Sequence, residues 1–128
     1  MPVRSLNSSV FTWPNRNQVD RAVRAWAAEE AKKHPKLLRL GYFGSYARGD
    51  WGVGSDLDLV AVVVSSDVPF TSRSLVWNFD PLPVPAEILV YTLDEWNKLV
   101  SGGGRFIRTV ERETVWVVSE LGDTGGLM

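Results

Sequence analysis

Two aspartates, Asp56 and Asp58, stand two positions apart at the start of an apolar run, downstream of a Gly-Ser pair at Gly44 and Ser45. A β-strand places alternate side chains on opposite faces, so two residues at this spacing project from the same face. Carboxylates held this close repel each other unless cations lie between them. Hard divalent ions such as Mg²⁺ take oxygen ligands and often combine one or two carboxylates with substrate phosphates. The spacing therefore indicates half of a phosphate-transfer site, and a solvated strand entrance is the alternative.

The Gly-Ser pair stands where an apolar strand is expected to give way to a short helical turn through Arg48. Such a turn offers unpaired backbone N–H groups, and glycine lets a phosphate approach the backbone closely. The Ser45 hydroxyl adds a donor, and Arg48, one helical turn further on, is placed to contact a phosphate. An ordinary glycine-containing turn followed by a surface arginine is the alternative interpretation.

Apolar periodicity indicates the elements that must position these residues. Helices are expected over residues 15–34 and 105–113, and a third helix is expected to begin at a cap, either Thr92 or Asp94, and to run through Leu99. Strands are expected over residues 37–43, 56–64, 86–92 and 115–118. Residues 65–85 contain four prolines and are expected to form a long connection with room for one short helix.

The composition limits the class of protein. With 45% apolar and 23% charged residues among 128, we expect one soluble globular domain over residues 1–128, with residues 1–12 and 120–128 as frayed ends. The longest apolar stretch, residues 59–64, is too short to cross a bilayer, and the first residues lack the apolar core of a signal peptide, so we expect a cytoplasmic location. The absence of cysteine excludes disulfides and Cys-type metal sites. A net charge of −1 gives no general attraction to nucleic acids or membranes, and we expect neither as a partner.

Taken together, these motifs resemble the signature of the DNA polymerase β-type nucleotidyltransferase superfamily. The residues that carry the resemblance are Gly44-Ser45, Arg48-Gly49 and Ser55-Asp56-x-Asp58 at the opening of an apolar strand. Within the superfamily the chain is similar to the minimal nucleotidyltransferases, which are small prokaryotic members with a single domain. The match is strongest over residues 37–64 and extends more weakly to the end of the predicted sheet. It implies an α/β (α+β) fold in which a mixed β-sheet is flanked by helices.

The resemblance also implies a nucleoside triphosphate, ATP, bound between the Gly-Ser turn and a centre of three carboxylates and two Mg²⁺ ions. The residues matching its nucleotide-binding positions are Gly44, Ser45, Arg48 and Ser55, and those matching its catalytic, metal-ligating acids are Asp56, Asp58 and Glu87. Glu87 stands where the family more usually has aspartate, and an ordinary surface acid is the alternative. The implied reaction is transfer of a nucleotidyl group, AMP, to a hydroxyl of an acceptor that the motifs do not specify.

The partners implied by the resemblance are proteins. Similar small members act as antitoxins that bind an all-helical ribonuclease toxin and adenylylate it, which gives a second hypothesis of a protein-binding neutraliser. We expect the acceptor surface to come from such a partner protein or from a second copy of the chain.

Three further features have ordinary explanations beside functional ones. Trp51 is placed either to stack on a base or to plug the site, and core or rim packing is expected of the other five tryptophans. His34 stands before Pro35, where a cation suits a helix C-terminus, and we assign it no chemistry. Three arginines near the C-terminus, Arg105, Arg108 and Arg112, lie at helical spacing and could form a basic stripe that binds an anionic acceptor. The alternative is a solvated helix face on which they pair with Glu111 and Glu113.

Overall fold

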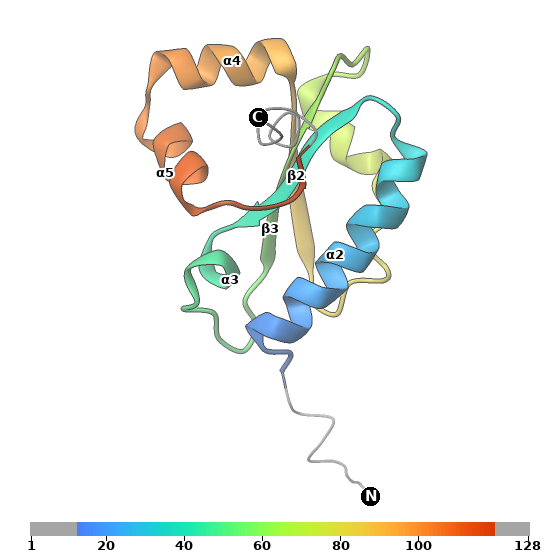
Figure 1. Cartoon of the computed structure of the whole chain (residues 1–128), viewed down its shortest axis with the longest axis vertical. Helices are drawn as coiled ribbons and strands as arrows, with labels where there is room; N and C mark the ends of the chain where they lie inside the picture. Colours follow the sequence, from blue (N-terminus) through green and yellow to red (C-terminus); the bar gives the residue numbers. More distant parts are fainter. Residues whose placement is uncertain (1–12, 120–128) are drawn as a thin grey trace, which may run out of the picture.

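A four-stranded sheet runs through the middle of the molecule, and helices cover both of its faces (Figure 1). This computed structural model describes residues 13–119, so the predicted frayed ends lie outside the described residues. The strands are β2 (Leu37–Phe43), β3 (Leu57–Val63), β4 (Ala86–Thr92) and β5 (Val115–Ser119), in the order β4-β3-β2-β5. Strand β2 is antiparallel to β3 and to β5, whereas β3 and β4 are parallel. The predicted mixed sheet is therefore confirmed.

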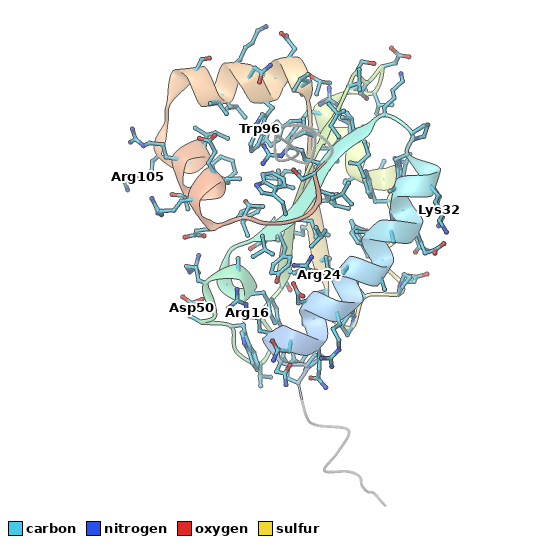
Figure 2. The ribbon with its side chains drawn as sticks, in the orientation of Figure 1. Arg16, Arg24, Lys32, Asp50, Trp96 and Arg105 are labelled. Atoms are coloured by element: carbon cyan, nitrogen blue, oxygen red, sulfur yellow. The ribbon has the colours of Figure 1, made fainter. Side chains whose placement is uncertain are left out.

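The two faces of the sheet carry separate apolar clusters because the side chains of β3 alternate. Helix α2 (Arg16–Lys33) covers one face, where Leu57 and Leu59 lie in the same buried cluster as Trp26. Helices α4 (Leu93–Gly102) and α5 (Arg105–Glu113) cover the other face, which contains Val60 and Val62. Figure 2 shows Trp96 of α4 directed toward this second cluster. Asp58, two residues before Val60, belongs to the face covered by α4 and α5.

The helix ends follow local capping chemistry. Asn15 forms a capping box with Gln18 at the start of α2, and Thr92, rather than Asp94, forms one with Glu95 at the start of α4. The prediction that α4 ends at Leu99 was wrong. The helix continues to Gly102 and ends where Gly103 adopts a left-handed conformation, with φ +64°, that suits glycine.

The proline-rich connection contains a short 3₁₀ helix, η1 (Phe70–Val76), as its composition allowed. Buried Arg73 attaches this helix to the sheet, because its guanidinium donates to the Val90 carbonyl at 3.0 Å and pairs with Glu95 at 2.6 Å. None of the helices within residues 13–119 has the length and apolar character that a bilayer crossing requires.

Candidate active site

The backbone of Gly44 lies close to the side chain of Asp58 where the paired strands β2 and β3 end. Gly44 precedes the short helix α3 (Ser45–Arg48) and has φ +80°, a conformation that L-residues rarely adopt. A Cβ at this position would collide with Oδ2 of Asp58. The glycine therefore allows the Gly-Ser turn and the Asp58 carboxylate to share one small space.

The strand register places the third predicted acid beside the second. Asp58 pairs with Glu87 across the parallel β3–β4 ladder and with Phe43 across the antiparallel β2–β3 ladder. Side chains at paired positions project from the same face of a sheet, so Glu87 and Phe43 flank Asp58 on opposite sides. Asp56, one residue before β3, is exposed at the same end of the sheet.

The electrostatics of Asp58 reflect this crowding. Burial of the carboxyl raises its pKa above the usual range, and the negative charges of Glu87 and Asp56 raise it further. The positive charge of Arg48 acts in the opposite direction. The three predicted acids thus interact electrostatically, and a cation placed among them would relieve the repulsion.

A hollow of about 490 Å³ opens beside Asp58, on the side of β2 and α5. Six of the seven predicted site residues line it, namely Gly44, Ser45, Arg48, Ser55, Asp56 and Asp58. Glu87 is not among the lining residues, because it lies on the other side of Asp58, on β4. The predicted nucleotide-binding residues and two of the acids are therefore brought together, and the third acid approaches the same carboxylate from the opposite side.

Helix α5 forms the wall of the hollow that faces the Gly-Ser turn. Its contribution is Phe106, Thr109, Val110 and Glu113, which are spaced as one helical face. Sequence reasoning missed these residues as part of the site. The sequence does show that these four residues share one face of a helix. An amphipathic pattern does not, however, indicate which other element that face packs against.

Two of the predicted nucleotide-binding side chains, Arg48 and Ser55, form intramolecular hydrogen bonds. The Arg48 guanidinium donates to Asp50 at 3.0 Å and to Glu113 at 3.3 Å, so acids from the following loop and from α5 neutralise it. The Ser55 hydroxyl accepts the Gly52 N–H at 2.8 Å and orders the loop that leads into β3.

The sequence matches the family described as nucleotidyltransferase domain over residues 24–117. This chain belongs to that family. The expected family membership is therefore confirmed, although no curated protein matches the chain significantly.

Solved structures show the same fold for this nucleotidyltransferase domain. A Sulfolobus solfataricus protein assigned as a nucleotidyltransferase gives a TM-score of 0.56 at 20% identity, over 79% of this chain and 80% of its own. A toxin-antitoxin structure with AMP-PNP gives 0.54 at 15% identity, over 80% of this chain and 77% of its own. A variant of the toxin-antitoxin MntA-HpeT gives 0.51 at 18% identity, over 88% of this chain and 78% of its own. These likenesses confirm the expected fold class.

The donor chemistry of the nucleotidyltransferase site suits Mg²⁺, since carboxylates supply the hard oxygen ligands that this ion takes. As the side chains stand, no three His, Asp or Glu residues within 13–119 form a ligating group. Binding a metal here would require the carboxylates of Asp56, Asp58 and Glu87 to turn toward a common point. A cation at that point would offset the repulsion that Glu87 and Asp56 exert on Asp58.

The remaining candidates lie outside the hollow. The ring of Trp51 stacks on buried Tyr46, with centroids 5.7 Å apart, so it packs at the rim of the core. His34 caps α2 and stacks on Trp77 at 3.9 Å. Figure 2 shows Arg105 pointing away from the body of the protein, and Arg108 and Arg112 are likewise exposed.

Proposed function

We propose that this nucleotidyltransferase domain binds a nucleoside triphosphate with Mg²⁺ and transfers its nucleotidyl group, AMP from ATP, to a hydroxyl of an acceptor. The observation that carries the proposal is the close approach of the Asp58 carboxylate to the backbone of Gly44. Phosphates bound at the Gly-Ser turn would lie beside the carboxylates. The absent Gly44 side chain lets the Asp58 carboxylate approach the turn, and the Ser45 hydroxyl offers a donor to phosphate oxygens.

Arg48 supplies the positive charge at the phosphate end of the hollow. Its partners Asp50 and Glu113 hold the guanidinium at the edge of the hollow before nucleotide arrives. The Arg48 and Asp50 side chains are exposed, so exchanging their ion pair for a phosphate contact costs little. Asp50 and Glu113 therefore position the Arg48 guanidinium to contact a phosphate.

Asp56, Asp58 and Glu87 are the residues that would hold Mg²⁺. When bound, this ion would stabilise negative charge on the phosphate oxygens. Glu87 lies on the side of Asp58 opposite the hollow, so we place the nucleotide on the α5 side and the acceptor hydroxyl on the β4 side. That arrangement suits in-line displacement, in which the acceptor oxygen bonds to the α-phosphorus as the bond to pyrophosphate breaks. A Glu87 carboxylate oxygen takes the hydroxyl proton.

A second candidate function is that of an antitoxin-type binding module. Two structures with this fold and TM-scores above 0.5 are toxin-antitoxin proteins, and one of them contains AMP-PNP. In this role the chain neutralises a helical, toxin-like partner with or without transfer, or assembles with a second copy of itself. The two functions differ in whether Asp56 is needed for the biological effect.

The test is labelling with α-labelled nucleoside triphosphates. Purified protein, alone and with extract of its native cell, is incubated with Mg²⁺ and each nucleotide, and the labelled product is identified. Asp58→Asn removes one carboxylate charge, and Asp67→Asn is the matched control because Asp67 is exposed in the connection after β3. We expect one acceptor to gain label with wild type and with Asp67→Asn, but not with Asp58→Asn. Absence of label in every sample, together with binding of a partner protein, would favour the binding module.

A further inference from the structure

Phe106 is an exposed aromatic residue inside the proposed nucleotide site. Its exposed fraction is 46%, and it is the only exposed large apolar side chain of residues 13–119 that lines the hollow. Exposing an aromatic ring to water is unfavourable, because burial of apolar surface is the main favourable contribution to folding. A ring left exposed in a binding hollow is therefore a candidate contact for a ligand with an apolar face.

The ring is held in place without being covered. Phe106 packs edge to face against Phe43, with centroids 6.1 Å apart and an interplanar angle of 85°. Phe43 is the β2 neighbour of Asp58 in the strand register. Contact with Phe43 therefore holds the Phe106 ring next to the strand position that neighbours Asp58.

The spacing along α5 matches the shape of a nucleotide. Glu113 contacts Arg48 at the phosphate end of the hollow, and Phe106 lies seven residues earlier on the same helical face. At 1.5 Å per residue the two positions are about 10 Å apart, which is of the order of the reach from phosphate to base. Thr109, midway between them, brings a hydroxyl to the same wall.

We propose that the Phe106 face of α5 is the nucleobase subsite, in which the base stacks on Phe106 while the phosphates lie at the Gly-Ser turn. Every base has a π face, so stacking alone tolerates all four, but the larger rings of purines cover more of the phenyl ring. The subsite therefore favours ATP and GTP over CTP and UTP. This inference rests on the proposed function, since it assigns one wall of the same site.

Calorimetry with two probes separates the base from the phosphates. A non-hydrolysable ATP analogue carries both groups, whereas inorganic triphosphate carries only the phosphates, and each is titrated with Mg²⁺ into wild type, Phe106→Leu and Phe106→Tyr. Leucine keeps an apolar contact with Phe43 without a ring, and tyrosine keeps the ring. Phe70→Leu is the matched control, because Phe70 is 39% exposed on η1, outside the hollow.

We expect Phe106→Leu to weaken the ATP analogue by about 5- to 150-fold and to leave inorganic triphosphate unchanged, as loss of one stacking contact requires. Phe106→Tyr and Phe70→Leu should match wild type. If wild type binds both probes and Phe106→Leu binds the ATP analogue equally well, the base subsite is wrong while the proposed function stands. If wild type binds neither probe, the proposed function itself fails.

Discussion

The Asp58 carboxylate occupies the space into which a side chain at Gly44 would project. The contact brings together the Gly-Ser turn and the Asp56–Asp58 pair, which are more than ten positions apart in the sequence. It also explains why the turn requires glycine. It also supplies a substitution whose effects on fold and on site can be separated.

Gly44→Ala should damage the site more than the fold. The new Cβ is opposed by the end of a side chain that can rotate, so the main stability cost is the backbone conformation, φ +80° and ψ −151°, which is about 1 to 3 kcal/mol for a residue other than glycine. Gly54→Ala is the matched control, because Gly54 has φ +87° but nothing within 4 Å of an added Cβ. Urea unfolding should show a loss of stability for both variants, whereas Mg²⁺-dependent nucleotide binding should fall at least about tenfold only in Gly44→Ala. Equal nucleotide binding by the two variants would contradict the shared-space account.

Asp58→Asn should stabilise the protein when no divalent ion is present. The folded-state pKa of Asp58 is raised, so ionisation at neutral pH opposes folding, and this penalty develops as pH rises from the unfolded toward the folded pKa. The amide avoids the penalty, and we expect the melting temperature at pH 7 to rise by roughly 2 to 4 °C. Adding MgCl₂ with nucleotide should raise the melting temperature of wild type but not of the variant. A variant less stable than wild type without Mg²⁺ would argue against crowded carboxylates.

Short-range patterns in the sequence predict the strands and the paired acids well. Residues 37–43 form β2 as predicted because a short apolar run ends at Gly44, and Asp58 and Glu87 share a face because they are paired in the β3–β4 register. Asp56 lies one residue before β3, so strand alternation does not place it. The sequence did not predict Glu113 as a partner of Arg48, since these residues are 65 positions apart and meet only when α5 closes over the sheet. The prediction treated Glu113 as part of a solvated face, but its side chain is only 15% exposed. Local patterns define elements, whereas packing between elements decides which helix face completes a site.

Glu87→Gln should separate binding from transfer. Glu87 lies outside the hollow, so nucleotide affinity should change less than about threefold, while transfer should fall by roughly 10²-fold because the amide cannot accept the hydroxyl proton. Glu87→Asp should keep measurable transfer, since it retains a carboxylate. The labelling assay checks both variants. Wild-type transfer by Glu87→Gln would make Glu87 a bystander.

Glu95→Gln tests the ion pair that attaches η1 to the sheet. The Arg73 hydrogen bonds, together with the Thr92 N–H, lower the pKa of Glu95 to about 2. Stability from this ionised carboxylate is therefore present above its unfolded pKa and is lost as pH falls toward 2. Because Glu95 is partly exposed, solvent screening reduces the effect, and we expect a loss of about 1 to 2 kcal/mol at pH 7. Urea unfolding of both proteins from pH 7 to pH 3 should show the difference shrinking, and a constant difference would contradict the assignment.

The proposed function requires that the Gly-Ser turn and the Asp56–Asp58 pair form one Mg²⁺-dependent site for a nucleoside triphosphate. Equilibrium dialysis of radiolabelled ATP, with MgCl₂ or with EDTA, measures this most directly in wild type, Asp56→Asn and the control Asp67→Asn. We predict that wild type and Asp67→Asn retain ATP only with Mg²⁺, and that Asp56→Asn loses at least about tenfold in affinity. Equal retention by Asp56→Asn and wild type, or ATP binding by wild type that is unchanged in EDTA, would contradict the account.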